Sequence, residues 1–354
     1  MSVFPFEHPF LSGLTGDREI AALFSVEADM AAMLAFEAGL AAAEGAEGII
    51  PAGAAAEIEC RIKTFQPDLE VLNQATARDG VVVPELVRQL RAAVGEPHAK
   101  SVHFGATSQD VIDTGLALRL ASAFDIFGAR LDELVARLDA LADRDGAIEV
   151  MAHTRMQAAI PVPASRKIES WRAPLLRHRA AMAGVREDVC VLHFGGAAGT
   201  RDKLGAAGAA VARRLAVGLD LTVPDTVRHA ERDGIAGLAG WLSLVTGTLG
   251  KMGQDIALAA QSEIGEIRLA SGGGSSAMPH KVNPVGAELL VALARFNATL
   301  LAGMHQALVH ENERSGAAWT LEWLLLPQMV VGCGTALRTA LSLVETISFV
   351  ERSD

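Results

Sequence analysis

Hydrophobic residues recur at helical spacing along most of the chain. The pattern predicts five long helices, at about 109–143, 162–191, 233–265, 287–310 and 318–350. Shorter helices are expected at about 18–44, 52–64, 68–78 and 84–94. Helices of these lengths predict an all-α fold built around a five-helix bundle.

A stretch of low periodicity from Gly95 to Gly105 divides the pattern in two. It predicts a small helical N-terminal domain at residues 1–100 and a central long-helix domain at residues 101–354. A second break, from Gly195 to Thr200, consists mainly of glycine and alanine. Such small residues predict close backbone packing, followed by a helix to about Gly218 that Thr200 caps.

The amino-acid composition argues against some classes of binding partner. Half of the 354 residues are hydrophobic, tyrosine is absent and the net charge is −11. This charge argues against a nucleic-acid or anionic-membrane partner, although local positive charge can still hold an anionic substrate. Because the chain has no uncharged apolar run of spanning length, no membrane span is expected. Three scattered cysteines and no signal-peptide pattern predict a cytoplasmic protein with reduced thiols.

The stretch from Ser271 to Pro284 has the clearest chemical pattern in the sequence. Its three consecutive glycines, 272–274, allow positive φ angles and close approach of the backbone to a ligand. Pro279 and Pro284 stiffen its second half, which predicts a lid that leads into a rigid anchor. A plain linker is the alternative, but linkers rarely combine Met, Pro, Lys and Asn in this order. A phosphate loop is excluded because valine follows Lys281.

The stretch from His103 to Thr114 lies where the first long helix begins. The hydroxyl groups of Thr107 and Ser108, with the first free amides of that helix, can hold an anion. A simple helix cap, completed by Asp110, is the alternative. From these residues alone, both interpretations remain open.

A third stretch, from Met151 to Pro161, contains His153, Arg155 and Gln157. Arginine stays protonated at any relevant pH, so Arg155 is no proton donor, but it can hold a carboxylate with two parallel hydrogen bonds. His153 shares the face of Arg155 only if the segment is extended, and a packing role is its alternative. Elsewhere, His305 and His310 lack the spacing of a helical metal pair, so neither a metal nor another cofactor is expected.

These stretches resemble the active-site segments of the fumarase/aspartase superfamily. Its signature G-S-S-x-M-P-x-K-x-N-P is matched at every fixed position from Gly274 to Pro284. The other two stretches are similar to segments of its adenylosuccinate lyase and carboxymuconate cycloisomerase branches. The resemblance implies a homotetramer in which three subunits share each active site. It also implies a small C-terminal third domain, which we expect to be absent or vestigial here.

The resemblance assigns roles by position. It makes Ser275 the carbon acid or base, and it makes Lys281 and Asn283 the groups that hold a substrate carboxylate and stabilise an enolate-like intermediate. Further contacts to a small polycarboxylate substrate are expected from Thr107, Ser108, His103, Arg155, Gln157, Ser276 and Met278. The roles of Arg232 and Asp233 stay open between subunit pairing and substrate contact.

Arg155 stands where lyases of the superfamily have a histidine that protonates the departing heteroatom. An amine leaving group needs that proton, and general acid catalysis contributes roughly 10²–10⁴-fold. A carboxylate is already ionised when it leaves or attacks, since its conjugate acid has a pKa of about 4. The resemblance therefore favours the cycloisomerase branch, which adds an internal carboxylate across a double bond in protocatechuate catabolism. An adenylosuccinate-type C–N lyase and a non-catalytic structural member are the alternatives.

Overall fold

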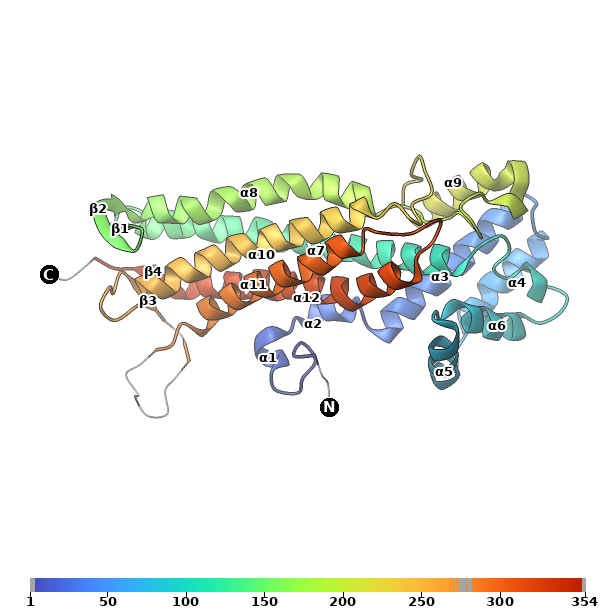
Figure 1. Cartoon of the computed structure of the whole chain (residues 1–354), viewed down its shortest axis with the longest axis horizontal. Coiled ribbons are helices and arrows are strands. Elements are labelled where there is room, and N and C mark those ends of the chain that lie inside the picture. Colours follow the sequence, from blue (N-terminus) through green and yellow to red (C-terminus); the bar gives the residue numbers. More distant parts are fainter. Residues whose placement is uncertain (1–3, 271, 274–277, 279–281, 352–354) are drawn as a thin grey trace.

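Five long helices run side by side in an elongated bundle (Figure 1). The computed structural model describes residues 4–270, 272–273, 278 and 282–351. The bundle helices are α7 (Ser108–Asp145), α8 (Ala164–Val189), α10 (Asp233–Ala259), α11 (Val285–Gln306) and α12 (Gly316–Thr346). The predicted five-helix bundle and the mostly α-helical fold are confirmed.

Shorter helices gather at one end of the bundle (Figure 1). They are α3 (Val26–Ala46), α4 (Ala52–Ile62), α5 (Leu69–Asp79), α6 (Val83–Val94) and α9 (Gly208–Gly218), with α1 (Ser12–Thr15) and α2 (Arg18–Ala22) beside the bundle. Two 3₁₀ turns, η1 (Ala99–Ser101) and η2 (Asp202–Ala207), complete the connections.

Two predicted helices are interrupted. The helix expected at 18–44 is divided into α2 and α3, because the Ser25 hydroxyl caps a new helix by accepting the Ala28 N–H at 3.2 Å. The helix expected from Thr200 begins only at Gly208. Arg201 and Gly205 have φ values of 54° and 51°, which an α-helix does not accommodate.

Two hydrophobic cores lie along the molecule. The larger one fills the bundle, with Trp171, Phe124 and Phe127 among its fully buried side chains. The smaller one joins α3, α4 and α6 to the start of α7 and to α9, whose Leu215 is fully buried. A helix more than one hundred residues further along the chain therefore completes the core of the N-terminal helices.

Short strands occupy the opposite end (Figure 1). Strand β1 (Glu149–Thr154) pairs with β2 (Gln157–Pro163) in an antiparallel hairpin, and β3 (Ile267–Leu269) pairs with β4 (Ile347–Phe349). The segment from Met151 to Pro161 is therefore extended and not helical, apart from the turn that joins the two strands. The helix predicted to reach residue 350 ends at Thr346, because β4 pairs with the segment that leads into the glycine-rich stretch.

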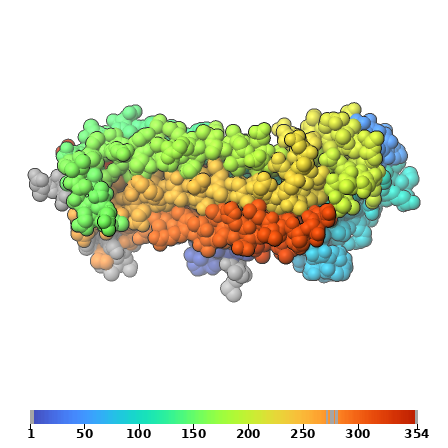
Figure 2. Space-filling view, turned by 45° about the horizontal axis from the view of Figure 1, so that its top comes forward, coloured from blue at the N-terminus to red at the C-terminus, as the bar shows by residue number. Residues whose placement is uncertain are grey.

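Helices α11 and α12 are long and apolar enough to cross a membrane by length and composition. Core helices of a bundle pass the same test, so two such helices are weak evidence for a membrane span. The apolar window of α12 is 61% buried, whereas that of α11 is only 28% buried. Helix α11 lies on one face of the bundle, where its orange atoms form part of the surface (Figure 2). The absence of a membrane span stays a prediction.

Candidate active site

Thr107 is the N-cap of α7 and forms a capping box with Asp110. The Thr107 N–H donates to Asp110 Oδ2 at 2.9 Å. Thr107 and Ser108 remain partly exposed at the start of the helix. Because the box leaves other first-turn amides without helical acceptors, the cap and an anion site can coexist at this terminus.

Asp110 fastens this helix start to a loop about 85 residues away. Its fully buried carboxylate accepts hydrogen bonds from the N–H groups of Gly195 and Gly196, at 2.8 and 3.0 Å, and contacts His229 Nε2 at 2.7 Å. A Cβ at Gly195 would lie 2.5 Å from Val227 Cγ1, and Gly196 has a φ of 69°. Both positions therefore require glycine, and the predicted close backbone packing is confirmed.

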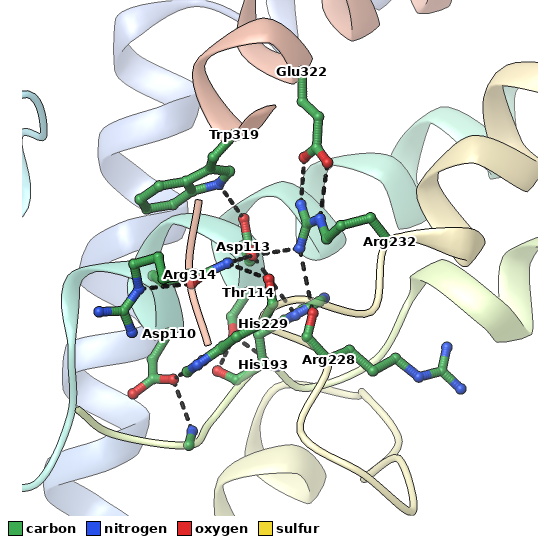
Figure 3. A network of polar contacts seen from close by, with 12 residues as sticks. Asp110, Asp113, Thr114, His193, Arg228, His229, Arg232, Arg314, Trp319 and Glu322 are labelled. Carbon is green, nitrogen blue, oxygen red and sulfur yellow. Dashed lines mark hydrogen bonds and ion pairs between the residues drawn. The ribbon is translucent and has the colours of Figure 1, made fainter. Parts of the chain in front are cut away.

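A buried ionic network lies beside Asp110 (Figure 3). Arg232 Nη1 donates to Asp113 Oδ2 at 2.7 Å, and its Nε donates to Glu322 Oε1 at 2.9 Å. Trp319 Nε1 donates to Asp113 Oδ1 at 2.9 Å, and Gln109 Nε2 donates to Asp113 Oδ2 at 3.1 Å. Burial alone would raise the pKa of Asp113 and lower that of Arg232, but their pairing outweighs burial and shifts each pKa the opposite way. Arg232 therefore supports the fold within one chain.

His103 stands out among the predicted site residues because it is paired. Its φ is 59°, and its Nδ1 lies 2.6 Å from Oε1 of Glu37, a buried residue of α3. Burial alone would lower the pKa of His103, but the charge and hydrogen bond of Glu37 outweigh it and raise that pKa. The imidazole is thus favoured as a cation close to the start of α7.

Arg155 and Met156 form the two-residue turn of the hairpin, with Thr154 and Gln157 paired on either side. Their φ values are 51° and 65°. A two-residue turn with both φ values positive is of type I′, which favours Asn-Gly, and a larger residue costs about 1–2 kcal/mol at such a position. Both side chains are exposed. The turn therefore presents both side chains to solvent at the tip of the hairpin.

His153 contributes to the hairpin itself. Met151, two residues earlier in β1, presents its carbonyl to the imidazole. His153 Nδ1 lies 3.1 Å from this carbonyl oxygen, so Nδ1 carries the hydrogen and donates it. This contact favours the structural interpretation of His153.

The glycine-rich stretch is described only at its base. The predicted residues Ser275, Ser276 and Lys281 lie outside the described residues. Gly273 and Asn283 form an antiparallel bridge, with N···O distances of 3.1 and 2.9 Å in the two directions. This bridge closes the base of the stretch and fixes the backbone of Asn283.

A hollow of about 610 Å³ opens beside this base. Asn283 and Met278 line it together with Arg268, an exposed residue of β3. Arg268 has no ion-pair partner among the residues that the structure describes, and it provides positive charge where a carboxylate is expected to bind. Sequence reasoning missed Arg268, although its place three residues before Ser271 was a possible signal.

Those predicted site residues that the structure describes fall at opposite ends of the bundle (Figure 1). Helix α7 has 38 residues, which corresponds to a length of about 57 Å. His103 and Thr107 precede this helix and Ser108 is its first residue, whereas the hairpin with Arg155 follows its far end. One chain therefore brings Arg155 and Asn283 to the same end but keeps the Thr107–Ser108 pair away from both.

Comparison with known proteins identifies the family. The model of a family described as Lyase matches residues 20–296, which is most of the chain. The chain therefore belongs to this lyase family, and the resemblance seen in its motifs is confirmed.

Within this family, curated relatives and a solved structure show which members the chain is similar to. The chain is 38% identical over 309 residues to the 3-carboxy-cis,cis-muconate cycloisomerase of Bradyrhizobium diazoefficiens, covering 86% of this chain and 68% of that protein. It is 39% identical over 311 residues to the enzyme of that name from Pseudomonas aeruginosa, covering 86% and 67%. The crystal structure of 3-carboxy-cis,cis-muconate lactonizing enzyme from Pseudomonas putida superimposes with a TM-score of 0.91 at 36% identity, covering 96% of this chain and 77% of that one.

Proposed function

We propose that this chain is a cycloisomerase that closes 3-carboxy-cis,cis-muconate to 4-carboxymuconolactone, a step of protocatechuate catabolism. A substrate carboxylate adds across a conjugated double bond in this reaction. Similarity to enzymes of this name over most of the chain supports the proposal. The single observation that carries it is Arg155, a permanent cation at the exposed tip of the hairpin.

Arg155 matters because it cannot act as a proton donor but can bind a carboxylate. It cannot give a proton to a departing amine, because an arginine side chain carries no proton that it releases at any relevant pH. It can hold a carboxylate through two parallel N–H···O bonds, and such charge-assisted bonds are roughly twice as strong as neutral ones. A reaction whose nucleophile or leaving group is an ionised carboxylate needs only this second property.

The proposed reaction forms one C–O bond and one C–H bond. As the carboxylate oxygen attacks the alkene, the π electrons move onto the carboxylate conjugated with it and give an aci-carboxylate. Lys281 and Asn283 stabilise this charge, and Ser275 delivers a proton to the carbon next to it. The remaining carboxylates are held by Thr107, Ser108, His103, Arg155 and Gln157, with Ser276 and Met278 beside them.

The active site is proposed to form between copies of the chain in a homotetramer. The roughly 57 Å that separate the two ends of α7 support this, because a single small substrate cannot reach both. The outward face of α10 also supports it. A Cβ added at Gly237, Gly240 or Gly247 would meet nothing within 4 Å, and Leu244 beside them is 61% exposed. Such a face allows close packing of another helix; the number four rests on the resemblance.

Loss of muconate absorbance, followed with and without the 3-carboxyl group, tests the function. We expect fast loss with the 3-carboxy substrate. Ser275→Ala should lower turnover by orders of magnitude and leave substrate binding nearly intact. If binding collapses while bound substrate still turns over, Ser275 is not the proton donor.

Three further outcomes would contradict the proposal. Efficient fumarate release from adenylosuccinate would favour the C–N lyase alternative. A much faster cyclisation by Arg155→His would show that a proton donor is needed at this position after all. No loss of absorbance with either muconate would favour the non-catalytic alternative.

A further inference from the structure

Helix α3 buries two glutamates in the core of the N-terminal helices. Glu37 is 1% exposed, and Glu44, two turns further along, is fully buried. Among the residues that the structure describes, Glu37 has one hydrogen-bond partner, His103, whose Nδ1 lies 2.6 Å from Oε1, and its Oε2 has none. Because a buried carboxylate costs free energy unless it is paired, the contact with His103 accounts for a carboxylate at this position.

The backbone on either side of His103 is fixed within the chain. His103 has a φ of 59°, a left-handed conformation that residues with a side chain rarely adopt. The carbonyl of Val102, the buried residue before it, accepts a hydrogen bond from Arg91 Nη2 of α6 at 3.0 Å. Four residues after His103, Thr107 closes the capping box of α7. Such a conformation persists only where the surroundings impose it, so α3, α6 and α7 together determine where the imidazole lies.

The contact with Glu37 decides what the other ring nitrogen of His103 can do. An ionised carboxylate only accepts hydrogen bonds, so Nδ1 carries a hydrogen and donates it. In the neutral ring Nε2 then has no hydrogen to donate to an anion, whereas in the cation it has one. Nε2 has no hydrogen-bond partner among the described residues, and the side chain is 14% exposed. The cationic ring therefore offers one free donor to a ligand.

Charged groups from three helices act on His103. Burial and the Arg91 cation of α6 lower its pKa, but Glu37 of α3 and Asp110 of α7 outweigh them and raise it. His193 shows the effect of burial without such a pairing. Its Nδ1 is buried without a hydrogen-bond partner among the described residues, and burial lowers its pKa from 6.5 to about 4. The Glu37 contact therefore distinguishes a cationic histidine from a neutral one.

We propose that Glu37 is a positioning residue that holds the His103 ring through Nδ1 and keeps it a cation, so that Nε2 donates to a substrate carboxylate at the start of α7. This inference rests on the function proposed above and gives His103 one role in it, the binding of an ionised carboxylate. Glu37 acts only through the ring and touches no substrate atom. Both residues belong to one chain and to one end of the bundle, so their contact is the same whichever copies of the chain complete the site.

Glu37→Gln tests the proposal with little change in shape. The amide oxygen still accepts the hydrogen of His103 Nδ1, but the negative charge is lost, so the ring becomes neutral at a lower pH. Binding through Nε2 is strong below the pKa of His103 and weakens as the pH rises through it. At about pH 7 we therefore expect the KM for 3-carboxy-cis,cis-muconate to rise about tenfold or more. The change in kcat should be smaller, because the lost interaction is one of binding.

Glu44→Gln is the matched control on the same helix. Burial and the nearby Glu37 charge raise the pKa of Glu44 to about 8, so at about pH 7 glutamine replaces a protonated side chain without a change of charge. This variant should keep KM within about twofold of the wild type. If Glu37→Gln does not fold, Glu37→Asp, which moves the charge away from the ring, should raise KM by a smaller factor. No rise in the Glu37 variant, or an equal rise in Glu44→Gln, would overturn the proposal.

His103→Asn separates positioning from general damage to the core. Asparagine tolerates a positive φ, so this variant removes the imidazole and keeps the backbone conformation. If Glu37 acts only through the ring, adding Glu37→Gln to His103→Asn should raise KM by less than about twofold further. A further rise of about tenfold would show that Glu37 acts on the site in another way, and it would overturn the proposal.

Chemical modification separates this inference from the proposed function. Diethyl pyrocarbonate acylates neutral imidazoles, and peptide mass spectrometry follows its reaction with His103. The pH at which this reaction reaches half of its maximal rate should be lower in Glu37→Gln than in the wild type, and unchanged in Glu44→Gln. If the wild type turns over no muconate, the proposed function fails, and the modification data alone decide the pairing. The same half-maximal pH in the wild type and in Glu37→Gln would then overturn it.

Discussion

The arginines that we compare at the two ends of the bundle have opposite surroundings. At the start of α7, Asp110, Asp113 and Arg232 are almost fully buried, and each makes several hydrogen bonds within the chain. At the hairpin end, Arg155 and Arg268 are exposed, and neither has an ion-pair partner among the residues that the structure describes.

The buried charges at the start of α7 support the fold, whereas the exposed arginines at the hairpin end are accessible to a ligand. A buried ion is tolerated only with partners, so the network around Arg232 fixes the backbone that carries Thr107 and Ser108. An exposed arginine without a partner contributes little to stability and stays free to bind a carboxylate. The first end is thus joined by contacts within one chain, whereas the other end is expected to be completed by substrate and by a second copy.

Mixing two inactive variants gives the largest expected effect. Ser108→Ala damages one end and Arg155→Met the other, so each homogeneous protein should lose most of its activity. If the two ends meet only between chains, a random mixture has both intact ends in roughly a quarter of its sites. The measurement is muconate turnover after the two chains are co-expressed or refolded together.

The matched control pairs two variants of the same hairpin. A mixture of Arg155→Met with Gln157→Ala has an altered hairpin in every site and should recover no activity. Failure of the Ser108→Ala and Arg155→Met mixture to recover, while mixed oligomers form, would contradict a site shared between chains.

Removing the buried cation should have the next largest effect. Arg232→Met leaves the carboxylates of Asp113 and Glu322 buried without their counter-ion, which costs about 3–5 kcal/mol of unfolding free energy. Arg155→Met removes an exposed cation and should change that free energy by no more than about 0.5 kcal/mol. Urea unfolding followed by tryptophan fluorescence measures both. Similar losses in the two variants would remove the distinction between the ends.

Glu44 of α3 differs from the other buried charged residues at the start of α7, because its carboxylate has no partner among the described residues. Its substitution should have the smallest effect of those considered. Both of its carboxylate oxygens are buried without a hydrogen-bond partner. Burial, with the nearby Glu37 charge, raises the pKa of Glu44 from 4.5 to about 8. Between these values the unfolded chain loses a proton that the folded chain keeps, so stability falls as the pH rises.

Glu44→Gln removes this ionisation. The unfolding free energy of the wild type should therefore fall relative to the variant by ~2–3 kcal/mol as the pH rises from 5 to 8, with little difference near pH 5. Thermal melts across this range provide the measurement. Parallel curves for the two proteins would show that Glu44 does not stay protonated in the folded chain.

The sequence located much of the candidate site but not what supports it. The capping residues Thr107 and Asp110 were evident because their signal is local, three positions apart. The further bonds of Asp110 reach Gly195 and His229, 85 and 119 positions away, and no spacing rule predicts such contacts. The hairpin around Arg155 was missed for a related reason: its turn has neither asparagine nor glycine, which are the residues that announce such a turn.

The sequence by itself determined the five long helices and the family, because helical periodicity and the glycine-rich signature are carried by neighbouring residues. Only the tertiary structure decided that Arg232 is a structural ion and that Glu37 of α3 pairs with His103. It also decided that Thr107 and Arg155 stand at opposite ends of α7. Those facts depend on which distant segments pack together, and packing is settled by the burial of whole helices and not by local sequence.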